Sequence, residues 1–202
     1  IEYIINKGID NGYCFDAITN GVDLKYFSTY LLDNKIRNIQ ITIDGPPEIH
    51  NSERCFGNGM GTFDIIAENI SMSLDCGAHV ALRINISKKN IHSLVQLFEI
   101  FYRKNWLMNT NFHPYVFPLQ KSGCPEDRYY LRIREFIDNM DLECDLKKTI
   151  FLLLTPGNEI YNNFINVFEN RELLKLKYLF CKAQTGMYIF DPFGNIYSCL
   201  QN

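Results

Sequence analysis

The sequence lacks the features of several broad classes of protein. Its apolar runs, such as the one from Ile150 to Leu154, are far shorter than the ~20 residues that a membrane-spanning helix needs. No charged, apolar and small-residue signal peptide opens the chain. Basic residues are not in excess, with 20 Lys and Arg against 23 Asp and Glu, so there is no positive field to attract nucleic acid. We therefore expect a cytoplasmic protein that binds neither membranes nor nucleic acid.

Two common site motifs are also missing. No G-x-G-x-x-G follows a predicted strand, and the nearest glycines, Gly57, Gly59 and Gly61, lie in a loop well beyond a strand end, which disfavours a dinucleotide site. The seven cysteines contain no C-x-x-C, and their odd number without a secretion signal indicates reduced thiols. Five of them are isolated and are most simply small buried or surface side chains: Cys14, Cys55, Cys76, Cys124 and Cys144.

What is present indicates a single α/β fold. The 202 residues, 47% of them hydrophobic, are enough to bury one sizeable core. Short apolar runs alternate with segments of helical period, which predicts βα units around a largely parallel sheet, in either a doubly wound sheet or a (β/α) barrel. Strands are predicted over 14–19, 36–43, 79–86 and 109–116. Helices are predicted over 24–33, 62–77, 90–101, 127–140 and 159–179. Thr62 and Asn90 are the expected N-terminal caps of the second and third of these helices, and Gly77 is the expected C-terminal stop of the second.

The segment after the second strand begins with Asp44-Gly45-Pro46-Pro47, whose prolines end ladder pairing. We expect a polar loop from there to Thr62. The Asp44 carboxylate is expected to cap the turn, and His50 to order the loop together with Glu48 and Arg54. General acid–base chemistry by Asp44 or His50, or a substrate contact by Arg54, is the alternative, and we assign none of them a catalytic role.

Four strings stand in a recognisable order: 18–21 (ITNG), 39–46 (IQITIDGP) with 48–51 (EIHN) and Arg54, 59–70 (GMGTFDIIAENI), and 82–86 (LRINI). Near the C-terminus, Cys181 is followed by twelve residues, Gly194, four residues and Cys199. Together these resemble barrel strands and the opening C-x(9-15)-G-x(4)-C of the extension in radical S-adenosylmethionine (SAM)/SPASM proteins. Anaerobic sulfatase-maturing enzymes and peptide maturases are the subgroups that the chain resembles most.

The resemblance implies a partial (β/α) barrel of the TIM type, strands three to six, followed by the start of a SPASM β-hairpin. It assigns residues 1–140 to the C-terminal part of the barrel, 141–180 to a helical linker and 181–202 to the beginning of the extension. The family's C-x(3)-C-x(2)-C and Gly-Gly-Glu motifs are not in the sequence. We expect both to precede Ile1, and the remaining SPASM cysteines to follow Asn202.

Three residues are candidates for binding SAM: Thr19, Thr42 and Arg83. Each falls near the C-terminal end of a predicted strand, the open rim of a (β/α) barrel, and matches a position where the family contacts SAM. A threonine there can hydrogen-bond ribose or adenine, and an arginine can clamp a carboxylate. A structural role is the alternative for each residue. The Thr19 hydroxyl can hydrogen-bond within the turn at Asn20-Gly21, and Thr42 can be present only for its strand propensity. Arg83 can form a structural ion pair with an acidic neighbour.

Cys181 and Cys199 flank a predicted β-hairpin, with strands at 187–190 and 196–198 around an Asp-Pro-Phe-Gly-Asn turn. By the resemblance they are metal ligands of an auxiliary 4Fe-4S cluster. Two ligands do not hold such a cluster, so in this chain two free thiols or half of a zinc site are the alternatives.

The function implied is that of a fragment of an iron-sulfur radical SAM enzyme. In complete form it would cleave SAM reductively to a 5'-deoxyadenosyl radical and abstract hydrogen from a protein or peptide substrate, with electrons from a donor of the flavodoxin or ferredoxin type. The fragment alone is expected to be inactive. A cluster-free barrel that binds a small ligand or partner protein is the alternative; an aldolase-like barrel ranks last because no predicted strand ends in lysine.

Overall fold

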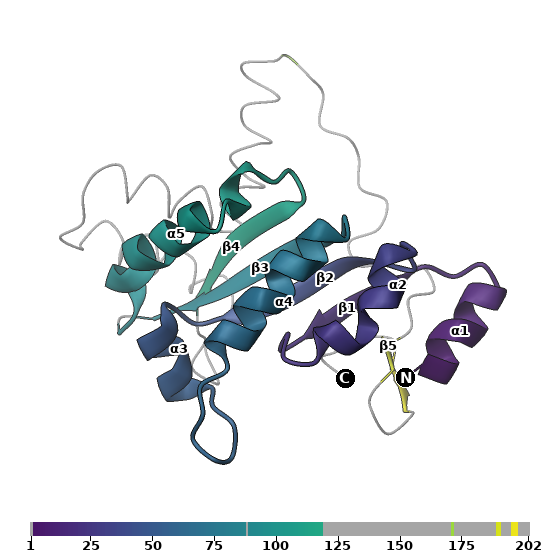
Figure 1. Ribbon diagram of the computed structural model, residues 1–202, viewed down its shortest axis with the longest axis horizontal. Coiled ribbons are helices and arrows are strands. Elements are labelled where there is room, and N and C mark those ends of the chain that lie inside the picture. The colour runs from purple at the N-terminus through teal and green to yellow at the C-terminus, as the bar shows by residue number, and fades with distance from the viewer. Residues whose placement is uncertain (1, 88, 119–170, 172–188, 191–194, 198–202) are drawn as a thin grey trace.

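The computed structural model describes residues 2–87, 89–118, 171, 189–190 and 195–197, and helices and strands alternate through most of its first part (Figure 1). The elements are, in chain order, α1 (Glu2–Asp10), β1 (Phe15–Thr19), the 3-10 helix η1 (Leu24–Phe27), α2 (Ser28–Leu32), β2 (Ile36–Ile43), α3 (Pro47–Glu53), α4 (Phe63–Asp75), β3 (His79–Ile86), η2 (Ile91–Ser93), α5 (Leu94–Arg103), η3 (Trp106–Met108), β4 (Phe112–Pro118), β5 (Ile189–Phe190) and β6 (Ile196–Tyr197).

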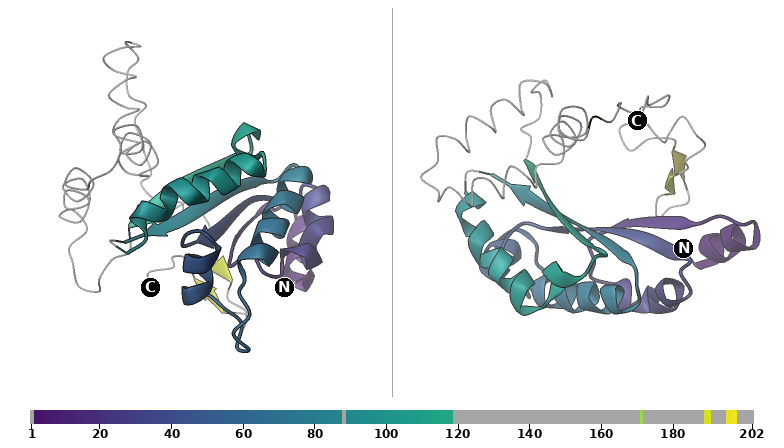
Figure 2. Two further views of the ribbon diagram at one scale, coloured as in Figure 1. Left: turned by 60° about the vertical axis from the view of Figure 1, so that its left-hand side comes forward. Right: turned by 90° about the horizontal axis from the view of Figure 1, so that it is seen from above.

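The first four strands form one sheet whose order follows the chain, β1-β2-β3-β4, with every neighbouring pair parallel. The sheet is curved, and helices α2 to α5 lie along its convex face (Figure 2). A doubly wound sheet reverses its strand order and carries helices on both faces. Winding in one direction, with the helices outside, is instead the pattern of a (β/α) barrel. The predicted α/β class is therefore confirmed, and the sheet is wound as a partial barrel.

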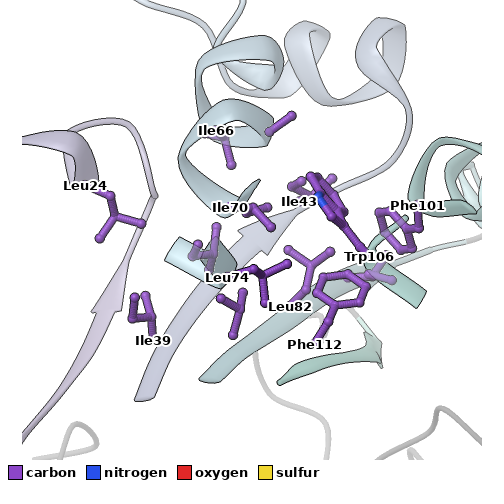
Figure 3. Packing of buried hydrophobic residues seen from close by; sticks show 14 of the residues in the cluster. Leu24, Ile39, Ile43, Ile66, Ile70, Leu74, Leu82, Phe101, Trp106 and Phe112 are labelled. Atoms are coloured by element: carbon purple, nitrogen blue, oxygen red, sulfur yellow. The ribbon is translucent and has the colours of Figure 1, made fainter. Parts of the chain in front are cut away.

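The hydrophobic core lies between this sheet and the helices. Alternate residues of the central strands are fully buried because they face the helical layer, among them Ile39 and Ile41 of β2 and Leu82 of β3. From α4, Ile70 and Leu74 point onto these strands (Figure 3). The predicted spacing of apolar residues in α4 is thus confirmed, and the helix ends before Gly77, whose φ of +81° suits the left-handed conformation expected of a stop residue.

Two α-helices, α1 and α3, were not predicted from the sequence. The sequence indicates a polar loop after Pro47, yet Pro47–Glu53 forms α3. Proline is tolerated in the first turn of a helix, where its missing N–H has no intrahelical partner, so a proline that was expected only to prevent strand pairing begins a helix. The placement of His50 in a loop is therefore wrong: it lies in α3 and is fully buried.

The fourth strand is displaced from its predicted range. It covers Phe112–Pro118 instead of 109–116 because η3 and a turn at Asn109 precede it. In that turn the Asn109 carbonyl accepts from the Phe112 N–H at 3.0 Å, and its side-chain oxygen accepts from the Asn111 N–H at 2.9 Å. The predicted strands 36–43 and 79–86 agree with β2 and β3.

Near the C-terminus, β5 and β6 pair antiparallel, with Ile189 opposite Tyr197 and Phe190 opposite Ile196. This pairing agrees with the predicted hairpin. The predicted helices 127–140 and 159–179, the helical linker 141–180 and both hairpin cysteines lie outside the described residues. Across the part that is described, no helix is long and apolar enough to cross a membrane.

Candidate functional site

Parallel strands bring their carboxyl ends to one edge of the sheet. The register pairs Thr42 of β2 with Arg83 of β3, and Arg83 with Tyr115 of β4. Paired residues of neighbouring strands point to the same side, and their sequence neighbours Ile41, Ile43, Leu82 and Ile84 are fully buried toward the helices. The side chains of Thr42, Arg83 and Tyr115 therefore form a row on the side of the sheet that faces away from the helices. We use the name polar face for this row together with three neighbours on the same side, Gln40, Asn85 and Phe117.

Arg83 is the cation of this face, and two contacts hold its side chain. Its Nε–H donates to Asn85 Oδ1 at 3.0 Å, and the guanidinium carbon lies 3.9 Å from the centre of the Phe117 ring. The ion pair that the sequence left open for Arg83 is not among those of the described residues. Within that part of the chain, four of its five N–H groups have no hydrogen-bond partner, so the guanidinium can still bind an anion.

Asp44 follows β2 and is 8% exposed. Its carboxylate does not cap the turn after it, as the sequence suggested, but links two elements. Oδ1 accepts from Asn85 Nδ2 at 2.8 Å, and Oδ2 accepts a charge-assisted bond from Arg54 Nε. A buried carboxylate needs such partners, and here both oxygens have one.

His50 holds the backbone of Asp44 from the other side. Its Nδ1 accepts from the Asp44 N–H at 3.2 Å, and its Nε2 lies 3.1 Å from Thr62 Oγ1. The Thr62 hydroxyl donates its one proton to the Arg54 carbonyl at 2.9 Å, so Nε2 must carry the hydrogen of a neutral imidazole. Burial lowers the pKa of His50 from 6.5 to about 4, with Asp44 raising and Arg54 lowering it. A ring with both nitrogens engaged and a pKa this low is structural, not a general base.

The two predicted helix caps have other roles. Thr62 makes no capping bond, because its hydroxyl serves His50 and Arg54. Asn90 makes none either: its Nδ2 donates to the carbonyls of Asp44 (2.6 Å) and Asn85 (2.8 Å), while its Oδ1 accepts from the Ser87 N–H at 2.6 Å. Asn90 therefore ties the end of β2 to the end of β3.

Tyr115 completes the row next to Arg83. Its hydroxyl donates to Gln40 Oε1 at 2.9 Å, which spans from β4 to β2. Burial raises the pKa of Tyr115, and Arg83 partly opposes this shift. The phenol therefore remains protonated at neutral pH and acts as a hydrogen-bond donor.

The structure brings Thr42 and Arg83 together but separates Thr19 from them. Thr19 pairs with Ile41, so it belongs to the side of the sheet that faces the helices. Its hydroxyl accepts from the Gly21 N–H at 3.1 Å, which is the turn contact that the sequence left open. The Thr42 hydroxyl, by contrast, has no hydrogen-bond partner among the residues that the structure describes, and its side chain is half-buried on the polar face.

The predicted metal ligands, Cys181 and Cys199, lie outside the described residues. The described cysteines are the free thiols of Cys14, Cys55 and Cys76. Residues 2–87 and 89–118, with the short described pieces beyond them, contain no group of three or more His, Cys, Asp or Glu side chains that could hold a metal ion.

Sequence reasoning did not single out Gln40, Asn85, Tyr115 or Phe117. A signal for Asn85 was available, since a period of two from Arg83 places it on the same side of β3. Tyr115 and Phe117 required the register between β3 and β4, which no local pattern supplies.

No family model matches the sequence, and no curated protein matches it. Among solved structures, the chain is similar to anSMEcpe, an anaerobic sulfatase-maturing enzyme. A hexahistidine-tagged form with bound AdoMet has a TM-score of 0.45 at 18% identity, over 61% of this chain and 35% of that one. A native form with bound AdoMet and the Kp18Cys peptide has a TM-score of 0.46 at 17% identity, over 75% of this chain and 38% of that one. A further native form, with AdoMet and the Cp18Cys peptide, has a TM-score of 0.45 at 18% identity over 81% of this chain and 40% of that one. The chain thus spans less than half the length of the solved chains to which it is similar.

Proposed function

We propose that this chain is part of a radical SAM enzyme with a SPASM extension, and that its polar face binds SAM through Arg83 and Thr42. The observation that carries the proposal is a half-buried arginine in the carboxyl-terminal half of β3, on the side toward the carboxyl edge of the singly wound parallel sheet, held in place yet with four N–H groups that have no partner among the described residues. That edge is where (β/α) barrels bind their ligands. The strand strings that resemble the family lie on the same strands.

The residues present fit SAM as a ligand. Its amino-acid carboxylate matches the two parallel donors that the end of a guanidinium offers, and its ribose hydroxyls or adenine match the Thr42 hydroxyl, which has no partner in the part of the chain that the structure describes. Tyr115 and Gln40 add polar groups beside Arg83. When SAM and a four-iron cluster are bound, they supply reductive cleavage and hydrogen abstraction; the described residues supply binding and orientation.

Iron is assigned to parts of the protein beyond the described residues. We propose that the ligands of the SAM-cleaving cluster precede Ile1, and that Cys181 and Cys199 contribute to an auxiliary cluster in the extension that begins at 181. The substrate class that we propose is a protein or peptide, and the reductant an electron donor of the flavodoxin or ferredoxin type, in the cytoplasm. The chain by itself is inactive on this proposal, because it holds neither complete ligand set.

The test uses the complete reading frame, expressed anaerobically and reconstituted with iron and sulfide. We expect a C-x(3)-C-x(2)-C upstream and release of 5'-deoxyadenosine from SAM under reduction. Replacing Arg83 by Ala or Thr42 by Val should lower this release at subsaturating SAM, since each removes a binding contact. Absence of the triad, or no SAM cleavage by the reconstituted protein, would refute the proposal and favour a cluster-free barrel.

Two threonines give a matched comparison within that experiment. Thr42→Val removes a hydroxyl on the polar face that has no partner among the described residues, whereas Thr19→Val removes one that is already bonded to the Gly21 N–H. The proposal predicts a raised KM for SAM in Thr42→Val and an unchanged KM in Thr19→Val. An equal rise in both would mean that Thr19 also reaches SAM in the complete protein.

The cysteine assignment has its own measurement. In the complete reconstituted protein, Cys181→Ala with Cys199→Ala should lower bound iron by about one four-iron cluster, because such clusters usually take four cysteine ligands. Unchanged iron in this double variant would remove the two cysteines from the ligand set.

A further inference from the structure

Asn85 stands between the buried Asp44 and the cation Arg83, and the chemistry of Asp44 determines which way its amide points. An ionised carboxylate accepts hydrogen bonds and donates none. The Asn85 NH2 must therefore face Asp44 Oδ1, at 2.8 Å. This leaves Asn85 Oδ1 on the side of Arg83, where it accepts from Nε–H at 3.0 Å. With the amide reversed, its NH2 would oppose the guanidinium.

Asp44 can impose this orientation because it is itself immobilised. Arg54 holds its other carboxylate oxygen, His50 accepts from its N–H at 3.2 Å, and Asn90 donates to its carbonyl at 2.6 Å. Asn90 also donates to the Asn85 carbonyl at 2.8 Å, so both ends of the Asp44–Asn85 bond are held by one side chain. Asp44, His50, Asn85 and Asn90 are all buried, which shields these bonds from competing water.

The result at Arg83 is a guanidinium fixed on one edge and one face. Asn85 takes the Nε–H, and the Phe117 ring lies 3.9 Å from the guanidinium carbon. Arginine otherwise loses substantial rotamer freedom when it binds a ligand, and that loss weakens binding. Fixing Nε also directs the two terminal nitrogens, which form the pair of donors suited to a carboxylate.

We propose that Asn85, oriented by Asp44 and Arg54, is a positioning residue that presents Arg83 to the amino-acid carboxylate of SAM. This inference rests on the proposed function, because it takes SAM as the ligand of Arg83. It adds that the affinity for the amino-acid part of SAM depends on a buried polar chain reaching back to α3.

The experiment is equilibrium dialysis of the complete protein, reconstituted with iron and sulfide, with labelled SAM and, separately, with 5'-methylthioadenosine, which shares the adenosine and the sulfur atom but lacks the amino-acid part and the sulfonium charge. The unmodified protein should bind SAM more tightly, and Arg83→Ala should reduce this preference because it removes the proposed carboxylate contact. Asn85→Ala should weaken SAM binding about tenfold, the scale of one hydrogen bond to a charged group, and leave methylthioadenosine binding unchanged. The double variant Asn85→Ala/Arg83→Ala should match Arg83→Ala alone, since Asn85 acts only through Arg83.

Asn38→Ala is the matched control. Asn38 lies at the other end of β2 and donates to Asp16 Oδ1 at 2.7 Å, so its loss should leave both affinities unchanged. If thermal unfolding shows that Asn85→Ala does not fold, Asp44→Asn replaces it: an amide at 44 can donate as well as accept, so it no longer fixes Asn85, and SAM affinity alone should fall.

Three outcomes would overturn the inference. Equal weakening of both ligands by Asn85→Ala would make Asn85 a residue that only maintains the fold. Fully additive effects of Asn85→Ala and Arg83→Ala would mean that Asn85 acts independently of Arg83. No preference for SAM in the unmodified complete protein would remove the proposed SAM site itself, and the positioning role with it.

Discussion

The neutral, buried His50 predicts a pH dependence of stability that can be worked out from the structure. The ring has no exposed surface, and its pKa is about 4 in the folded chain against 6.5 ordinarily. Between these values the unfolded chain binds a proton at His50 that the folded chain does not. The contribution of the neutral ring is therefore fully present above pH 6.5 and is lost as the pH falls toward 4. A shift of this size corresponds to about 3 kcal/mol of unfolding free energy.

The perturbation that isolates this contribution is His50→Gln. A glutamine amide does not titrate and has an N–H to donate to Thr62, but it leaves the buried Asp44 N–H without its acceptor, which costs about 1–3 kcal/mol. At pH 7 the variant should be less stable than the unmodified chain. Toward pH 4 the difference should shrink by about 3 kcal/mol and vanish or reverse, because only the unmodified chain carries the His50 titration.

Urea denaturation from pH 7 to pH 4, followed by fluorescence, measures both curves. Trp106 is the single tryptophan of the chain and is 2% exposed, so its emission reports unfolding of the sheet and helices. His92→Gln, at an exposed position in η2, is the control and should keep the slope of the unmodified chain. Parallel curves for the unmodified chain and His50→Gln would refute the assignment of a neutral, buried imidazole.

Three further substitutions test the packing that supports the site. Gly21→Ala should destabilise the fold by about 1–3 kcal/mol, because residue 21 has φ of +87° and the added Cβ would lie 3.0 Å from the Ile41 side chain; a thermal melt measures the loss. Asn69→Ala should cost about 1–3 kcal/mol in urea denaturation, since its buried Nδ2 donates to the Gly21 carbonyl at 2.7 Å, and an unchanged midpoint would contradict that role. Ser71→Ala removes the acceptor of the Trp106 indole N–H, 3.0 Å away, and should cost about 1 kcal/mol and shift the fluorescence.

Much of the sheet followed from the sequence because its signals are local. The β-branched run at 36–43 and the run at 79–86 became β2 and β3 with the predicted bounds, and the three-four spacing after Thr62 became α4. The short helix α3 was missed because Pro47 is read equally well as the end of a strand and as the first residue of a helix. The start of β4 was misplaced because an asparagine turn, with no strong sequence signal, precedes it.

The candidate site was predicted in part, for the same reason. A charge in the middle of an apolar strand identified Arg83 from local sequence alone. Its surroundings were not predictable in this way, since Asn85 is bonded to a residue 41 positions away and Tyr115 to one 75 positions away.

By itself, the sequence determined the α/β class and the positions of the central strands, because propensity and periodicity act over a few neighbouring residues. It also identified the polar residues Thr42 and Arg83 within those strands. Only the tertiary structure decided that the sheet is singly wound, since strand order depends on which strands pair. It also separated Thr19 from Thr42 and Arg83, because register determines the side of the sheet to which each strand residue points. The tertiary structure also gave His50 a structural role in place of a catalytic one. Its burial among Asp44, Arg54 and Thr62 determines both the hydrogen bonds of the ring and its neutral state.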